Sequence, residues 1–201
     1  MAGRLHSVVR VRTLLGPLAA FALLCALSSW STAQAQLRIV VIGDSQIAGK
    51  GVSSSEAYPA KLEAALRAHG QNVVVVNAGV SGDTTSGVLA RLDSSVPNGT
   101  NLAIVSVGIN DIVRGGSPGQ VAANLNEIKK RLTARGIETL MLPYGKGFQG
   151  SAFDKPELHV EKVRLPGHYH LNAAGYDVVV ARTLPQVVGA LAKARRKSGS
   201  H

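Results

Sequence analysis

A short polar motif, Gly43-Asp44-Ser45, follows a run of four apolar, β-branched residues at 39–42. Such a run is typical of a strand buried on both faces, and the glycine with polar residues behind it indicates a turn into a helix. Side chains at the carboxyl end of a parallel strand project into the crevice above the sheet, where α/β proteins bind their ligands. The hydroxyl of Ser45 is therefore a candidate nucleophile.

Three more polar segments follow apolar strands or precede a helix: Asn77-Ala78-Gly79, Gly108-Ile109-Asn110-Asp111, and the segment that begins at His170. Alone, each has an ordinary structural interpretation. Gly79 suits a turn and Asn110 suits the end of a strand. His170 lies just ahead of Asn172, a candidate helix cap. Their order along the chain and their shared position at the ends of strands or before a helix make them candidates for one common site.

The elements that must position these segments alternate along the chain. Apolar runs predict strands at 39–42, 72–76, 102–107 and 137–142. Helical spacing and capping signals predict helices at 56–69, 84–92, 117–135 and 172–184, with Pro185 kinking the last helix or starting another segment. Residues 143–167 are the least regular, with a short strand expected at 158–163. This alternation predicts a parallel sheet with helices on both faces.

The ordered set Ser45, Gly79, Asn110 and His170 resembles the four signature blocks of the SGNH (GDSL) hydrolase family. The resemblance spans nearly all of 37–184, and residues 77–91 are especially similar to the bacterial lysophospholipase and thioesterase branch, which is arylesterase-like. It implies a three-layer α/β/α, flavodoxin-like fold around a parallel sheet of four to five strands. It also implies an ester hydrolase that needs no metal or organic cofactor.

The resemblance gives each residue a role that makes physical sense. His170 would act as the base for Ser45, because a serine hydroxyl is a poor nucleophile at neutral pH. The backbone N–H groups of Ser45 and Gly79 and the side-chain amide of Asn110 would form an oxyanion hole, which stabilises negative charge on an attacked carbonyl oxygen.

One part of the family pattern is missing. These enzymes usually carry an aspartate three residues before the histidine, and here that position is Gly167. The acid normally fixes the imidazole tautomer and stabilises the imidazolium. A backbone carbonyl near Gly167 that orients His170 in a Ser-His dyad is the interpretation we favour. Two others stay open: a weakened or inactive relative that only binds acylated ligands, or a replacement acid from the irregular stretch, namely Asp154, Glu157 or Glu161.

Other titratable side chains near these segments have structural interpretations. We expect Asp44 and Asp111 to hydrogen-bond the loops. His168 and His170 alternate along an extended segment and therefore point to opposite sides. No carboxylate or cysteine cluster joins them or His159 at ligand spacing, so no metal site is predicted.

Residues 1–35 have the pattern of a secretory signal peptide, with basic residues, an apolar stretch at 14–27 and a cleavage site at Ala33-Gln34-Ala35. An uncleaved anchor is the alternative. It is disfavoured because the stretch is shorter than the roughly 20 residues of a membrane span. The pattern predicts export to the periplasm or the exterior, with 36–201 as a single domain. Cys25, the only cysteine, lies in the signal, which leaves the domain without a thiol.

The formal net charge is +10, or +7 without the three arginines of the signal. Much of the excess lies in the tail at 193–201, which predicts a solvated helix end with weak attraction to anionic envelope surfaces. Aromatic residues are only 4% of the chain, which argues against nucleic-acid binding by base stacking. The expected partner is a small acyl ester or thioester: a lysophospholipid, a short acyl ester or an O-acyl sugar. Oligomeric state stays open.

Overall fold

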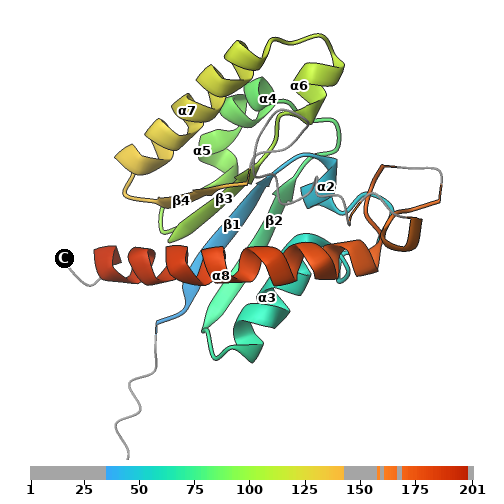
Figure 1. Cartoon of the computed structure of the whole chain (residues 1–201). Helices are drawn as coiled ribbons and strands as arrows, with labels where there is room; N and C mark the ends of the chain where they lie inside the picture. The colour runs from blue at the N-terminus through green and yellow to red at the C-terminus, as the bar shows by residue number, and fades with distance from the viewer. Residues whose placement is uncertain (1–34, 143–157, 159–160, 167–168, 199–201) are drawn as a thin grey trace, which may run out of the picture. The chain divides into compact units, whose positions relative to one another are not determined.

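The computed structural model describes residues 35–142, 158, 161–166 and 169–198. Within these residues, one sheet of four parallel strands has the order β2-β1-β3-β4 (Figure 1). The strands are β1 (Leu37–Gly43), β2 (Val73–Gly79), β3 (Leu102–Ser106) and β4 (Glu138–Met141). The predicted parallel sheet of four to five strands is confirmed.

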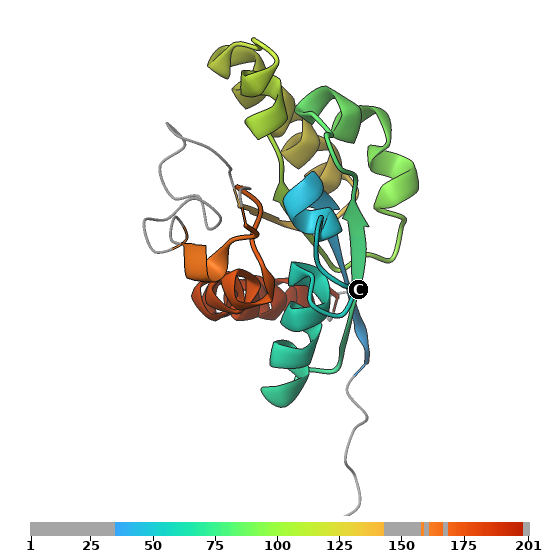
Figure 2. The same cartoon turned by 90° about the vertical axis from the view of Figure 1, so that its right-hand side faces the viewer.

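Helices cover both faces of the sheet, which gives the three-layer α/β/α arrangement seen in Figure 2. Ile39 and Val41 of β1 pack with α3 (Tyr58–Ala68) and α8 (Ala173–Ser198). Val40 and Ile42 pack on the other side, with helices α4 (Thr85–Ala90), α5 (Leu92–Ser95) and α7 (Pro118–Ala134). Because successive side chains of a strand point to opposite faces, the part of β1 that lies between the two helical layers, residues 39–42, is apolar at every position.

Local signals set the starts of two long helices. Ser117 Oγ accepts the N–H of Gln120 at 3.1 Å, with Pro118 in the first turn of α7. Asn172 Oδ1 accepts the N–H of Gly175 at 3.0 Å at the start of α8, so the cap predicted there is confirmed. The side chain of Gln120 donates to Asn124 rather than returning to the cap, so only half of a capping box forms.

The structure differs from the sequence expectations in the C-terminal part of the chain. The described residues of 158–163 do not form the expected strand, because Glu161–Val163 is a 3-10 helix, η2. Leu158 and Val163 pack in the same core cluster, whereas a strand would send positions five apart to opposite faces. Further along the chain, no new segment starts at Pro185, since α8 continues through it to Ser198 rather than ending near 184. Burial of Val187 and later apolar residues offsets the roughly 3 kcal/mol that a proline costs inside a helix.

Short helices directly follow two strands at the carboxyl edge of the sheet. Helix α2 (Ser45–Ala48) follows β1, and α6 (Ile109–Val113) follows β3. The single helix predicted at 84–92 is instead two short helices, α4 and α5. None of the helices in the described residues is long and apolar enough to cross a membrane. The signal peptide and the single domain at 36–201 stay predictions.

Candidate active site

The register of the sheet brings three predicted segments to one edge. Gly43 at the end of β1 pairs with Gly79 on one side and with Ser106 on the other. Ser45 lies two residues beyond Gly43, and Asn110 lies four residues beyond Ser106. The turn from β3 into α6 passes through Gly108 at φ +134°, a backbone conformation that side chains disfavour.

His170, from the segment that leads into α8, contacts Ser45. Its Nε2 lies 3.0 Å from Ser45 Oγ, across 125 positions of sequence. Both residues are buried, at 3% and 4% exposed. With the ring proton on Nδ1, Nε2 accepts the hydrogen of the serine hydroxyl, as a general base must.

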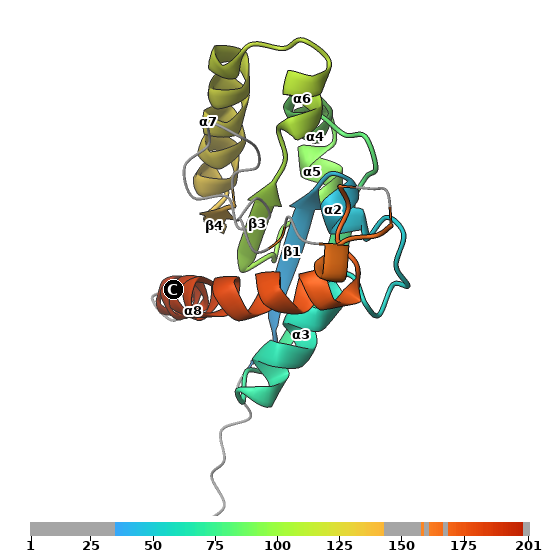
Figure 3. The same cartoon turned by 45° about the vertical axis from the view of Figure 1, so that its right-hand side comes forward.

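The start of α8 contacts α2, the short helix that begins at Ser45 (Figure 3). The hydroxyl of Tyr176 donates to the backbone carbonyl of Gln46 at 2.9 Å. The backbone carbonyl of His170 accepts the N–H of Leu165 at 3.0 Å. The Tyr176 bond holds α8 against α2, and the Leu165 bond fixes the segment that carries His170.

An exposed aromatic ring covers one face of the His170 imidazole. The ring of Tyr169 is stacked on it, with centroids 4.2 Å apart and an angle of 29° between the planes. The guanidinium of Arg164 donates to the backbone carbonyl of Tyr169 and holds this segment. An aromatic face stabilises a neighbouring cation by about 0.5–1 kcal/mol at exposed sites. Sequence reasoning missed Tyr169, although its place directly beside His170 was the available signal.

Two of the three predicted oxyanion donors already have a partner within the protein. The N–H of Gly79 donates to Asn77 Oδ1 at 2.9 Å. One hydrogen of the Asn110 amide is donated to the backbone carbonyl of Asp83 at 2.8 Å. The amide of Asn110 has a second hydrogen for a ligand, whereas Gly79 must share or exchange its acceptor. Ser45 opens α2, where N–H groups have no partner within the helix.

A buried carboxyl, Asp44, lies beside the candidate nucleophile. Its Oδ1 accepts the N–H of Gln46 at 3.0 Å and so caps α2. Burial raises the pKa of Asp44 to about 6, against the lowering effect of the Gln46 hydrogen bond. The nearby carboxylates of Asp83 and Asp111 make smaller contributions to this raised pKa.

Asp111 hydrogen-bonds the first residue of α4, whereas the sequence predicted hydrogen bonds to loops for it and for Asp44. Its two carboxylate oxygens accept from the backbone N–H of Thr85 at 2.9 Å and from its hydroxyl at 2.6 Å. Asn124 of α7 donates to the same hydroxyl at 2.8 Å. This network ties the start of α4 to α6, the helix that carries Asn110.

Several sequence predictions fall outside the described residues: Gly167, His168, His159, Asp154 and Glu157. The backbone of Glu161 lies in η2, but its side chain also falls outside them. The group that orients His170 therefore stays a prediction. In the described part of the chain, no group of three or more His, Cys, Asp or Glu side chains is arranged to hold a metal ion.

Residues 41–160 match the GDSL-like lipase/acylhydrolase family. The chain belongs to this family, and its class is that of the SGNH ester hydrolases. The matched region begins within β1 and contains β2 to β4 together with Ser45, Gly79 and Asn110. The family resemblance inferred from the sequence is confirmed.

Individual relatives agree with this class. The chain is 33% identical over 131 residues to an arylesterase of Vibrio mimicus, covering 62% of this chain and 66% of the arylesterase. It is 36% identical over 105 residues to the esterase TesA of Pseudomonas aeruginosa, covering 52% of each chain. The alignments thus span about half to two thirds of these relatives. A crystal structure of TesA superposes with a TM-score of 0.69 at 25% identity, over 76% of this chain and 99% of that one.

Proposed function

We propose that this protein cleaves carboxylic esters or thioesters through an acyl-enzyme formed on Ser45. The observation that carries the proposal is the 3.0 Å contact between Ser45 Oγ and His170 Nε2 at the carboxyl edge of the sheet. Membership of an ester hydrolase family supports it. The relatives named arylesterase and esterase give the reaction class.

The reaction has two half-steps in this proposal. Ser45 Oγ attacks the acyl carbonyl while its proton moves to His170 Nε2, and the tetrahedral oxyanion is held by the N–H groups of Ser45 and Gly79 and the amide of Asn110. The C–O or C–S bond to the leaving group then breaks, and His170 returns the proton to that alcohol or thiol. Water, deprotonated by His170, then releases the acid and restores Ser45.

The residues around the site favour a substrate with an apolar acyl or aryl group. Val80 directly follows Gly79, Ile112 and Val113 lie on α6 with Asn110, and Tyr169 precedes His170; all four are exposed. Apolar side chains beside a reacting carbonyl stabilise bound hydrocarbon by removing it from water. We propose lysophospholipids, short acyl esters or O-acyl sugars as the substrate class.

The predicted signal at 1–35 places these substrates outside the cytoplasm in this proposal, in the periplasm or the exterior. The mass of the exported protein tests the predicted signal, because cleavage after Ala35 leaves a chain that begins at Gln36. The basic end of α8 is proposed to attract anionic envelope surfaces weakly. Unchanged binding to anionic vesicles after deletion of 193–201 would contradict the proposed attraction.

The experiment that tests the reaction is hydrolysis of p-nitrophenyl esters from acetyl to palmitoyl by the wild type, Ser45→Ala and His170→Ala. Ser55→Ala and His69→Ala are matched controls, because Ser55 and His69 are exposed and belong to neither the strand ends nor the start of α8. We expect turnover in the wild type and both controls and its loss in both site variants. Equal rates in the wild type and Ser45→Ala would contradict the acyl-enzyme.

A binding protein for acylated ligands is the second candidate. Gly167 at the usual acid position and the engaged N–H of Gly79 favour it. It predicts saturable binding of a lysophospholipid or an acylated sugar by the wild type with no turnover of any ester or thioester. Turnover that depends on Ser45 removes this candidate.

A further inference from the structure

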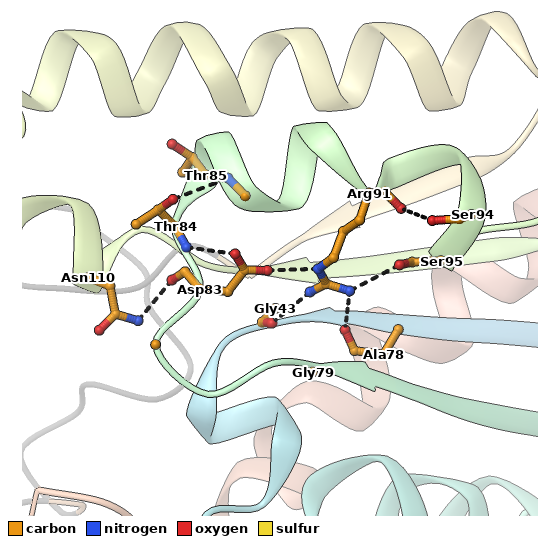
Figure 4. Close-up of polar contacts among 12 residues, drawn as sticks. Gly43, Ala78, Gly79, Asp83, Thr84, Thr85, Arg91, Ser94, Ser95 and Asn110 are labelled. Atoms are coloured by element: carbon orange, nitrogen blue, oxygen red, sulfur yellow. Dashed lines mark hydrogen bonds and ion pairs between the residues drawn. The ribbon is translucent and has the colours of Figure 1, made fainter.

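The guanidinium of Arg91 donates four hydrogen bonds at the carboxyl edge of the sheet (Figure 4). Its Nε donates to Asp83 Oδ2 at 2.8 Å, and its Nη1 donates to the backbone carbonyl of Ala78 at 2.9 Å. Its Nη2 donates to the backbone carbonyl of Gly43 at 3.1 Å, and Nη1 also reaches Ser95 Oγ at 3.1 Å. The Arg91 side chain is 22% exposed and that of Asp83 10%, so this ion pair is largely shielded from water.

The two carbonyls that Arg91 binds lie next to two of the proposed oxyanion donors. Ala78 directly precedes Gly79, and Gly43 lies two residues before Ser45. The carbonyl of Gly43 also accepts the N–H of Val80 at 2.9 Å, which joins the end of β1 to the residue after Gly79. One planar guanidinium thus fixes the ends of β1 and β2 relative to each other.

Asp83 extends the same network to the third donor. Its carboxylate holds Arg91 with one oxygen and the N–H of Thr84 with the other, at 3.0 Å. Its backbone carbonyl accepts from the Asn110 amide at 2.8 Å. A displacement of Asp83 therefore displaces the acceptor that orients Asn110 (Figure 4).

We infer that Arg91 is the positioning residue of the oxyanion hole, which sets the relative places of the Ser45, Gly79 and Asn110 donors without touching the substrate. The inference rests on the proposed function, which gives these three groups their common task. Oxyanion stabilisation depends on donors aimed in advance at the developing charge, and an error of about 1 Å can cost about 100-fold in rate. Arginine suits this role because its rigid planar fork serves several acceptors at once, whereas a lysine ammonium is a single point charge.

The test compares Arg91→Lys with Arg135→Lys in the full chain. Arg135 is a close match, because its side chain is also 22% exposed, it pairs with Asp93 at 3.1 Å, and it donates to the backbone carbonyl of Val96. Arg135 lies between α7 and β4, where the amino end of β4 begins, and so at the end of the strands away from Ser45. Both variants exchange a multidentate guanidinium for an ammonium, but only one of them touches the site.

We expect Arg91→Lys to lower kcat about 10- to 100-fold with KM within about threefold of the wild type, since the affected donors act on the transition state. Arg135→Lys should keep the wild-type kcat. Asp83→Asn should lose less than Arg91→Lys, because the bonds to Gly43 and Ala78 and the backbone acceptor for Asn110 remain. Equal kcat values for Arg91→Lys and Arg135→Lys would overturn the inference.

A spectroscopic readout separates this inference from the proposed function. In nuclear magnetic resonance spectra of the folded variants, Arg91→Lys should shift the backbone amide signals of Ser45 and Gly79 and the side-chain amide signal of Asn110 together. Arg135→Lys should shift none of them. Shifts confined to α4 and α5 would refute the positioning role. A wild type without esterase turnover would remove the proposed function and still leave this result decisive.

Discussion

The backbone of Gly79 packs directly against the backbone of Ala48, so closely that a Cβ at Gly79 would lie 2.2 Å from the Ala48 nitrogen. It would also lie 2.6 Å from the carbonyl carbon of Ile47. The end of β2 therefore abuts α2, the helix that opens with Ser45. The sequence alone suggested a turn at Gly79. In the structure the glycine admits the backbone of the neighbouring helix.

Substitution Gly79→Ala should displace α2 and lower both stability and turnover. Overpacking of this kind costs about 1–3 kcal/mol of unfolding free energy. The matched control is Gly189→Ala in α8, where an added Cβ meets nothing within 4 Å. That change should raise the unfolding free energy by about 0.5–1 kcal/mol and leave kcat unchanged. Denaturant unfolding and ester turnover measure both, and wild-type values for Gly79→Ala would contradict the packing argument.

Substitution Asn110→Ala should lower kcat by about 100- to 1,000-fold, the usual effect of removing one oxyanion donor. Asn101→Ala is the control, because Asn101 also uses its side chain to hold a backbone group, the N–H of Arg38, at the opposite end of the strands. Steady-state kinetics on a p-nitrophenyl ester separate the two. A loss of similar size in Asn101→Ala would mean that the effect comes from folding rather than from the oxyanion.

Ionisation of Asp44 should make the protein less stable as pH rises. Its pKa of about 6 lies above the ordinary value of 3.8, so the folded state binds more protons than the unfolded state between these values. The unfolding free energy should therefore fall from about pH 4 to about pH 6 and level off above, by at most about 3 kcal/mol. Asp44→Asn keeps an oxygen for Gln46 and should remove this fall, as urea unfolding across pH would show. Asp93→Asn, at an exposed carboxylate, is the control.

Substitution Tyr169→Leu should lower kcat about two- to fivefold, which corresponds to the roughly 0.5–1 kcal/mol that an aromatic face gives a neighbouring cation. Tyr169→Phe keeps the ring and should keep kcat. An equal loss of kcat in both variants would implicate the hydroxyl, and wild-type kcat in both would show that the stacked ring does not matter. Rates at saturating ester, measured with equal amounts of folded enzyme, provide the comparison.

Substitution of the three candidate replacement acids distinguishes a Ser-His dyad from a triad. The Ser-His dyad that we propose predicts that Asp154→Asn, Glu157→Gln and Glu161→Gln each keep kcat within about threefold of the wild type. Loss of the acid of a related triad costs about 10,000-fold. A loss of that size in a single variant would identify the acid and replace the dyad by a triad.

The sequence by itself determined the layered fold and the order of the site segments. Uninterrupted apolar strands such as 39–42 are explained only by burial on both faces, and the glycine and polar residues behind them fix where each strand ends. Parallel strands that alternate with helices bring those ends to one edge. Ser45, Gly79 and Asn110 could therefore be placed there before any coordinates were known.

Tertiary structure decided everything that depends on contacts between distant segments. The pairing of Ser45 with His170 depends on where α8 packs, and the stacking of Tyr169 depends on the turn before it. Pro185 inside α8 shows burial overriding a local signal. The bonds of Arg91 to Gly43, Ala78 and Asp83 depend on three strand and loop ends that only folding brings within one side chain's reach. Local patterns follow from neighbours in sequence, whereas hydrogen-bond networks follow from neighbours in space.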